Sequence, residues 1–583
     1  MPSHAKMTGW YDPLRLIAIA TRVAISTVFG EFADRRESMA MAREIDPAGI
    51  DPAYDYTQEQ DGDFWLDFIA DTGDGWDSTY AMARLLASPE LPVAGSDQVL
   101  RRGRVLVMGG DQVYPTASRD NYRMKLIAPF DQAARGADWT GAEADLYAIP
   151  GNHDWYDGLV SFIALFCRRR LPSSWSEGRR GRVIGGRHSK QTRSYFALAL
   201  PHGWWLWGLD IQLEGYIDQA QVDFFDHVAR HWMPPNSHLI LCTGQPDWVY
   251  VDVNEPRRST FGNFSYMERL AELANPGNRL RLVLTGDSHH YSRYTEAGIN
   301  YITAGGGGAF LHPTHQLTDK SFEWDYPPPG SGSERRGLYR RNFQIARDSK
   351  TNEPALFPRP SVSRKLAFRN LAFWYWNPQF ALTLGTFYAL YAWLLHTNAE
   401  IRHVSMQQAL QGSGFPDLAQ YLDLAVVTPW PAMFALAVLV GCVYFADFVP
   451  VWKRCLAGFV HWFAQISLAV LIPLALAGWG PIQQSSVLLV VCIGVLGGLA
   501  APTVMGIYLL GCVNIFGRHW NEAFSALRIA DYKNFLRLRI ASDGTLTVFP
   551  VALERVPRNG RRDVQDASMH PHLIEAPIEI QSS

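Results

Sequence analysis

Acidic, amide and imidazole side chains follow five short hydrophobic runs in the first 290 residues. Each run is typical of a buried strand, and open α/β sheets bind ligands at the carboxyl ends of their strands. Five such ends in one domain can meet at a single site, and their oxygen and imidazole donors suit a pair of divalent cations. The five segments at these ends are Asp71–Asp74, Gly110–Tyr114, Gly151–Asp154, Thr243–Pro246 and Gly286–His290.

Helical stretches separate these strand ends along the chain. They are Ser78–Leu86, Asn121–Ala134 and Gln219–His231. The alternation predicts a layered α/β domain over residues 55–312. Residues 1–54 form an N-terminal segment without the pattern of a signal peptide. Within it we expect an amphipathic helix over Leu14–Phe32, which either lies on a membrane surface or packs on its own domain.

The motifs Gly110-Asp-Gln-Val-Tyr114 and Gly151-Asn-His-Asp154, with Asp71-Thr-Gly73 before them, resemble the calcineurin-like metallophosphoesterases, including the purple acid phosphatases. The resemblance covers about residues 55–312. It implies a four-layer α/β/β/α sandwich and a phosphoesterase that binds two divalent metal ions. Manganese, magnesium and iron are the metals it implies. A metal-bound hydroxide would attack the phosphorus of a phosphomonoester or phosphodiester.

The resemblance also implies a role for each residue of the motifs. Asp111 would bridge the two metals, and Asn152 would bind the second one. His153 would assist the leaving oxygen, oriented by Asp154. The ligands implied for the first metal are Asp71, Asp111, Tyr114 and His289.

The chain departs from the family pattern twice, both times at the second metal. Asp287 stands where the family's Gly-His-x-His motif has its first histidine. The loop that should carry a histidine before proline reads Thr243-Gly-Gln-Pro246, and a slip of one residue offers Gln245 as a ligand. An oxygen-rich second site favours manganese or magnesium over zinc. The alternative is a weakened or empty second site.

A second region, residues 371–515, is mostly apolar. It contains four segments of membrane-spanning length, since about 20 residues cross a ~30 Å hydrocarbon layer. The segments are roughly 371–396, 424–448, 456–479 and 486–512. We therefore predict a transmembrane helical bundle. Basic residues concentrate before the first segment, between the second and third, and after the fourth, which predicts that both soluble parts face the cytoplasm.

Two further segments flank this region. Residues 313–370 are basic and rich in proline and glycine, which predicts a linker. Residues 516–583 form a tail in which Phe535–Ile540 and Thr545–Val551 alternate apolar and polar residues around a Ser-Asp-Gly turn. This pattern predicts a β-hairpin. Because an isolated hairpin is marginally stable in water, we expect it to join the sheet of the phosphoesterase domain; the alternative is a small independent tail.

These observations lead to one function and one alternative. We expect an integral, multi-pass protein of the plasma (inner) membrane whose phosphoesterase domain lies in the cytoplasm. Its substrate would be a phosphate ester, and tethering to the membrane favours one that is linked to a lipid. The alternative is a membrane sensor or transport subunit with a degenerate, non-catalytic domain. A formal net charge of −3 gives no support to a nucleic-acid partner. The pattern specifies no oligomeric state.

Overall fold

The chain divides into two compact units in a computed structural model. The first comprises Met1–Thr8, Ile19–Ser363 and Ile529–Ser583, and the second comprises Gly9–Ala18 and Arg364–Arg528. In the sequence, most of the second unit is therefore an insertion into the first. The structure describes residues 4–17, 54–59, 62–139, 144–167, 183–211, 217–253, 261–275, 277–326, 339–403, 419, 423, 429–558 and 569–582. Most of the amphipathic helix predicted over Leu14–Phe32 lies outside these residues.

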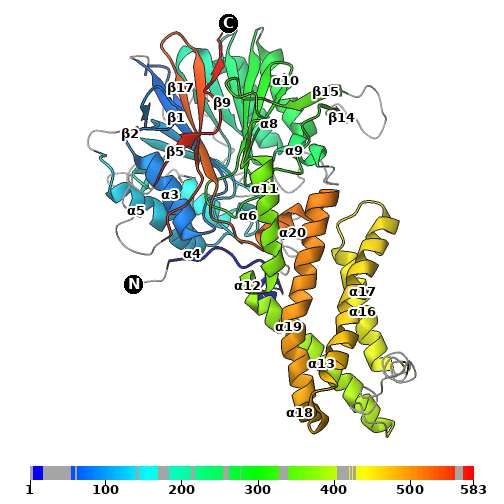
Figure 1. Cartoon of the computed structure of the whole chain (residues 1–583). Coiled ribbons are helices and arrows are strands. Elements are labelled where there is room, and N and C mark those ends of the chain that lie inside the picture. The colour runs from blue at the N-terminus through cyan, green and yellow to red at the C-terminus, as the bar shows by residue number, and fades with distance from the viewer. Residues whose placement is uncertain are drawn as a thin grey trace. The chain divides into compact units, whose positions relative to one another are not determined.

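Within the described residues, the first unit contains two nine-stranded sheets. In one of them β1 (Phe64–Ile69) lies between β4 (Val105–Gly109), which is parallel to it, and β17 (Lys533–Ile540), which is antiparallel (Figure 1). β5 (Asp145–Ile149) is parallel to β4. The other strands of this sheet are β18 (Leu546–Leu553), β19 (His572–Leu573) and β20 (Ile578–Ile580) beyond β17, and β7 (Arg187–Ser189) and β6 (Val183–Ile184) beyond β5.

The second sheet has four parallel strands at its centre. Their order is β9 (Trp204–Gly208), β10 (His238–Thr243), β11 (Arg279–Thr285) and β13 (Ile299–Ala304). β8 (Phe196–Ala199) pairs with β9. On the far side lie β12 (Tyr291–Glu296), β14 (Phe322–Tyr326), β15 (Tyr339–Ile345) and β16 (Leu356–Phe357).

Side chains on both faces of the central strands are buried. In β1, Phe64, Leu66 and Phe68 belong to one hydrophobic cluster that also contains residues of the second sheet, such as Ile240 and Leu282. Trp65 and Ile69 of β1 pack instead with α3 (Trp76–Ala87) and α5 (Ala128–Arg135). A third cluster joins the second sheet to α8 (Gln219–His227), α9 (Asp247–Asp252) and α10 (Phe261–Ala274). Strands buried on both faces read as near-continuous apolar runs, as the sequence does here.

Shorter helices complete the first unit. They are α4 (Arg119–Asn121), the π-helical η2 (Tyr122–Ile127), α6 (Asn152–Trp155), α7 (Val160–Phe166), the 3-10 helix η4 (Pro201–Gly203) and the π-helical η5 (Val228–Trp232). A two-stranded sheet, β2 (Glu90–Leu91) with β3 (Leu100–Arg101), also belongs to it.

The prediction that residues 313–370 form a linker is wrong for much of that stretch. β14 and β15 pair antiparallel, and β15 also pairs with β12. The physical reason is that Trp324, Phe343 and Ile345 are buried in the third hydrophobic cluster. The proline and glycine run that indicated a linker lies at 327–333, outside the described residues, so local composition masked the strands on either side of it.

The tail strand β17 is held to β1 by a buried ion pair as well as by backbone bonds. Asp67 and Arg537 stand opposite each other in the register and are both fully buried. Nε and Nη2 of Arg537 lie 2.7 Å and 3.2 Å from the two carboxylate oxygens of Asp67. Arg187 adds a contact of 3.6 Å to the same carboxylate. The pair joins residues 470 positions apart, so the segment after the helical insertion is an integral part of the sheet.

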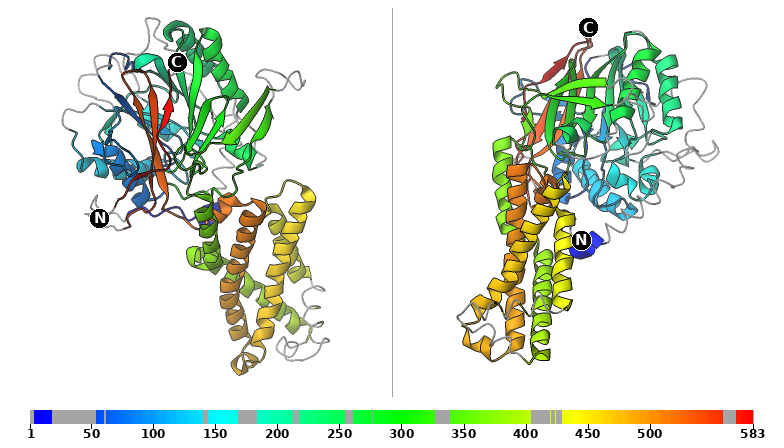
Figure 2. Two further views of the ribbon diagram at one scale, coloured as in Figure 1. Left: turned by 45° about the horizontal axis from the view of Figure 1, so that its top comes forward. Right: turned by 90° about the vertical axis from the view of Figure 1, so that its right-hand side faces the viewer.

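In the part of the second unit that the structure describes, four long helices run alongside one another (Figure 2). They are α13 (Pro378–Ile401), α16 (Pro429–Phe445), α17 (Val451–Leu476) and α19 (Ser486–Gly511). Shorter elements of this region are α11 (Pro360–Ala367), η6 (Phe368–Ala372), α12 (Phe373–Trp376), α18 (Gly480–Gln483), η7 (Cys512–Phe516) and α20 (Trp520–Ser525).

The four predicted membrane spans correspond to these four helices. Two of the helices are long and apolar enough to cross a membrane. Among the described residues, Val451–Leu476 and Ser486–Phe516 are long and apolar enough. α16 is apolar but shorter, with 17 residues. By length and composition alone, two of the described helices could cross a membrane, and a four-helix transmembrane bundle remains a prediction.

Arg537→Met should destabilise the protein much more than Arg539→Met on the same strand. Removing Arg537 leaves Asp67 buried with its main partner gone, and breaking a buried pair costs about 3 kcal/mol or more. Arg539 is half-buried and its ion-pair contact with Asp63 is 3.7 Å long, so its loss should cost less than about 1 kcal/mol. Urea unfolding followed by tryptophan fluorescence measures both. Similar losses for the two variants would contradict the importance of the Asp67 pair.

Candidate metal centre

The predicted ligands lie at the carboxyl ends of strands from both sheets. Asp71 and Asp111 follow the parallel strands β1 and β4, and Asp287 follows β11. All three have left-handed backbone conformations, with φ of 57°, 50° and 62°. Aspartate tolerates this region better than most residues, and such conformations gather at functional sites because the surrounding structure must enforce them.

Glycines permit the close approach of these strand ends. A Cβ atom on Gly151 would lie 2.1 Å from Oδ1 of Asp111, and one on Gly286 would lie 2.6 Å from Oδ2 of Asp71. The glycines of the sequence motifs therefore leave room for the carboxylates beside them.

The hydroxyl of Tyr114 lies at the centre of the first group of ligands. It is 2.8 Å from Oδ1 of Asp71, 3.1 Å from Oδ2 of Asp111 and 2.9 Å from Nε2 of His289. The hydroxyl has one proton, so it can donate to one of these three acceptors at a time. The remaining lone pairs face one another in a buried space. A cation among them would remove that conflict.

The spacing of these atoms suits a single octahedral cation. Ligands about 2.1 Å from one such ion stand roughly 3 Å apart when adjacent, close to the separations around the Tyr114 hydroxyl. Among the described residues, however, no three His, Cys, Asp or Glu side chains form a group that could hold an ion by themselves. The resemblance to the phosphoesterase family implies that the oxygen of Tyr114 is a further ligand.

Burial and mutual repulsion raise the pKa of the carboxylates. The pKa of Asp71 is raised well above its usual value, first by burial and then by the charges of Asp111 and Asp287. Burial also raises the pKa of Asp111. The pKa of Asp287 is raised by burial and by the charge of Asp111. Two buried carboxylates with a third, half-buried one beside them are unfavourable unless positive charge is supplied. The cluster therefore fits a site for divalent cations.

His289 is oriented as a metal ligand through Nε2. Its Nδ1 donates to the carbonyl of Phe310 at 2.8 Å, which leaves Nε2 facing the Tyr114 hydroxyl and Asp71. Metal-binding histidines commonly donate their other ring N–H to a backbone carbonyl in this way. Burial lowers the pKa of His289, so the ring is neutral. The ring of His312 stacks on it with centroids 3.9 Å apart.

The loop of residues 305–312, which we call the strap, holds the first ligand group in place. Its backbone N–H groups at Gly307 and Ala309 donate to the carbonyls of Ala70 and Asp71, at 3.0 Å and 2.8 Å. His312 accepts from the backbone N–H of His289 through Nδ1 at 3.0 Å. The strap thus fixes the backbone of one ligand and the position of another.

The tail holds the strap from the other side, which the sequence analysis did not foresee. Lys533 of β17 is fully buried and donates from Nζ to the carbonyl of Ala309 at 2.7 Å. The backbone N–H of Asn534 donates to Gly306, and that of Leu311 donates to Ile529. Burial lowers the pKa of Lys533 to about 8, against the raising effect of nearby aspartates, Asp71 among them. The signal in the sequence that could have indicated this contact is a lysine just before the alternating residues of the tail strand.

The residues predicted to bind the second metal have fewer contacts with one another than those predicted for the first. Asn152 follows β5, and its Oδ1 is buried without a hydrogen-bond partner in the described part of the chain, which suits an additional ligand. Asp287 accepts a hydrogen bond from the hydroxyl of Tyr250, a residue of α9 that the motifs did not indicate. Gln245 is half-buried on a loop whose Gly244 lies near Gly110. No hydrogen bond joins its side chain to another candidate ligand among the described residues.

The prediction that Asp154 orients His153 is wrong. Nδ1 of His153 donates to the carbonyl of Pro115 at 2.7 Å. Asp154 is fully buried and accepts from the backbone N–H groups of Gly151 and Gln112 and from the hydroxyl of Tyr122. The carboxylate of Asp154 therefore joins the two loops that carry Asp111 and Asn152. The backbone N–H groups of these loops occupy its oxygens in place of the imidazole of His153.

His153 nevertheless stands beside the ligand cluster. Its backbone N–H donates to Oδ1 of Asp111 at 2.8 Å, and its ring centroid lies 4.3 Å from that of Tyr114. Burial lowers the pKa of its imidazole to about 4. With the Nδ1 proton held by Pro115, Nε2 is the atom at which the ring can gain or lose a proton.

His289→Ala should weaken Mn²⁺ binding at least about tenfold, while His153→Gln should change it little. His289 presents its Nε2 to the ligand cluster, whereas the ring of His153 is bonded to a carbonyl outside it. Isothermal titration of the metal-free protein with Mn²⁺ measures both affinities. Equal binding by His289→Ala and the unaltered chain would remove His289 from the ligand set.

Three comparisons relate the chain to known proteins. None of the curated proteins matches the chain. Among solved structures, one described as GAP50, the anchor in the inner membrane complex of Plasmodium, is similar with 10% identity and a TM-score of 0.31, over 43% of this chain and 74% of that chain. Residues 64–291 match the family model for calcineurin-like phosphoesterase. They include the strand ends from Asp71 to His289, and the match supports a calcineurin-like phosphoesterase domain in this part of the chain.

Proposed function

We propose that this chain is a metal-dependent phosphoesterase anchored to a membrane. The observation that carries the proposal is the Tyr114 hydroxyl, which lies within 3.1 Å of acceptor atoms of Asp71, Asp111 and His289. This arrangement is stable in a buried site if a cation shares those lone pairs. The match of residues 64–291 to the phosphoesterase family supports the same chemistry.

The proposed fold of this domain is the four-layer α/β/β/α sandwich. Its support is the set of three hydrophobic clusters, one that contains residues of both sheets and two that join each sheet to helices. Such an arrangement keeps both sheets dry and leaves the strand ends open to a ligand.

The proposed mechanism assigns the proton transfer to His153. A pair of divalent cations in the cluster would polarise a phosphate ester and stabilise its developing negative charge. His153 keeps one tautomer because Pro115 holds its Nδ1 proton, so Nε2 would deliver a proton to the departing oxygen. The anionic substrate would raise the pKa of the imidazole from its low value in the free protein. Asp154 would hold the loops of Asp111 and Asn152 at a fixed distance through its bonds to their backbone N–H groups.

Membrane anchoring completes the proposal. α17 and Ser486–Phe516 supply two helices that could cross a bilayer. The phosphoesterase domain and the tail would face the cytoplasm, as the basic residues around the helices indicate. A domain tethered to a bilayer meets phosphate esters of lipids at high local concentration, which favours a lipid-linked substrate over a soluble nucleotide.

A second candidate function is a membrane sensor or transport subunit with a non-catalytic domain. Two observations favour it. Asp287 is already bonded to Tyr250, and among the described residues no group of three His, Cys, Asp or Glu could hold an ion. Two bound cations per chain would support the enzyme, and none would support this alternative.

Asp111→Asn should abolish hydrolysis of an aryl phosphate ester in the presence of Mn²⁺ while the protein remains folded. The substitution removes the negative charge that two cations would share. Initial rates with a nitrophenyl phosphate and a nitrophenyl phosphodiester measure the effect, and thermal unfolding serves as the control for folding. Undiminished turnover would remove Asp111 from its bridging role.

His153→Ala should slow the enzyme by about 10²- to 10⁴-fold on an alkyl phosphate ester, as expected for loss of a general acid. The loss should be much smaller on a nitrophenyl ester, whose leaving group departs without a proton. The measurement is kcat for the two substrates at saturating Mn²⁺. An equal loss on both substrates would mean that His153 does not protonate the leaving oxygen.

A further inference from the structure

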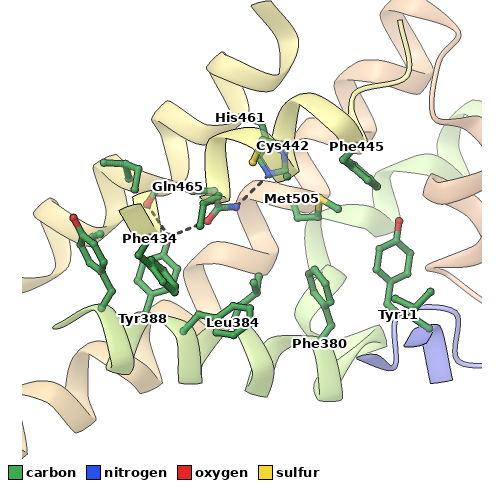
Figure 3. Close-up of a pocket in the computed structure, with 17 residues that line it drawn as sticks. Tyr11, Phe380, Leu384, Tyr388, Phe434, Cys442, Phe445, His461, Gln465 and Met505 are labelled. Carbon is green, nitrogen blue, oxygen red and sulfur yellow. Dashed lines mark hydrogen bonds between the residues drawn. The ribbon is translucent and has the colours of Figure 1, made fainter. Parts of the chain in front are cut away.

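The second unit contains an apolar cavity of about 390 Å³ (Figure 3). Aromatic rings form much of its wall, including Phe380, Tyr388 and Phe434. Its lining comes from α13, α16, α17 and α19, together with Tyr11 and Leu16 of the N-terminal segment. The volume lies in the range of small-molecule sites, about 300–1,000 Å³.

The polar groups of the wall are mostly bonded to one another. The hydroxyl of Tyr388 donates to Gln465, with 2.7 Å to its carbonyl and 2.9 Å to Oε1. Nε2 of Gln465 donates to the carbonyl of Ala501 at 3.1 Å and lies 3.3 Å from Nε2 of His461. No Asp, Glu, Lys or Arg is among the lining residues that the structure describes. The wall therefore offers little to a charged or strongly polar ligand.

The same helices expose large apolar side chains on their outer surfaces. Leu382, Trp430, Val440, Phe463 and Val487 are each at least 60% exposed. Soluble proteins rarely expose so many apolar side chains together. A hydrocarbon layer around the helices would cover these side chains, and it would also supply apolar chains at high concentration beside the cavity.

We propose that this cavity binds one hydrocarbon chain of a membrane lipid. The inference rests on the proposed membrane embedding of the helices. An apolar cavity of this size does not hold water well and takes up apolar molecules instead. A flexible acyl chain fits a wall of aromatic and aliphatic side chains, whereas a head group would find no charged partner there.

Gly441 of α16 allows a direct test. It lines the cavity, and a Cβ atom built on it would meet no other atom within 4 Å. Gly441→Phe should therefore add a large ring at the wall of the cavity without a clash at its Cβ atom. Gly511→Phe is the matched control, because a Cβ atom there also meets nothing within 4 Å and Gly511 does not line the cavity.

The experiment uses the full-length protein in nanodiscs of phosphatidylcholine with a photoreactive diazirine at the end of one acyl chain. After irradiation, mass spectrometry locates the labelled peptides. We expect labels at cavity residues such as Phe434 and Gln465, besides those at outer residues such as Trp430. Gly441→Phe should lower cavity labelling at least about tenfold, equivalent to about 1.4 kcal/mol of binding free energy. Gly511→Phe should leave it unchanged.

Three outcomes would count against the proposal. Unchanged cavity labelling in Gly441→Phe, or labels on the outer residues alone, would overturn it while the membrane embedding stands. An absence of labels from both surfaces would refute the embedding and this inference together. Thermal unfolding controls for folding, and Gly441→Leu repeats the test with a smaller side chain if the phenylalanine variant does not fold.

Discussion

Three neighbouring carboxylates, two buried and one half-buried, are the constraint on which the candidate site of the first unit depends. Asp71, Asp111 and Asp287 lie at strand ends, and the charges of Asp111 and Asp287 raise the pKa of Asp71. The structure keeps them there with unusual backbone conformations, glycines that admit close approach, and a tyrosine hydroxyl that cannot satisfy all its neighbours. These features are unfavourable together unless positive charge is supplied, and in the proposed function a cation supplies it.

The second unit is connected to this ligand set by the path of the chain. After leaving the helices at Arg528, the chain bonds the strap through Ile529, Lys533 and Asn534 before it enters the sheet beside β1. The strap in turn bonds the backbone of Asp71 and the ring of His289. The phosphoesterase unit is therefore built from segments on both sides of the insertion, and its candidate site depends on the later segment as much as on the motifs that precede it.

Several features followed from local sequence. Apolar runs that end in Asp, Asn or His place strands and their carboxyl ends well, because a buried strand needs a continuous apolar stretch and the chain must turn where that stretch ends. The tail hairpin was likewise visible, since alternation with a Ser-Asp-Gly turn is a local signal. The linker interpretation of 313–370 failed for the opposite reason. A few prolines and glycines dominated the local composition, while the aromatic residues around them had their partners elsewhere in the chain.

The sequence by itself determined which residue types stand at the strand ends, and with them the resemblance to phosphoesterases and the cation chemistry that this resemblance implies. Tertiary structure alone decided how they are held. It bonded His153 to Pro115 and turned Asp154 toward loop amides. It also brought Lys533 to the strap and Tyr250 to Asp287. The reason is that motif spacing encodes contacts along one strand and its loop, whereas hydrogen bonds between residues far apart in the chain depend on how the two sheets and the tail pack.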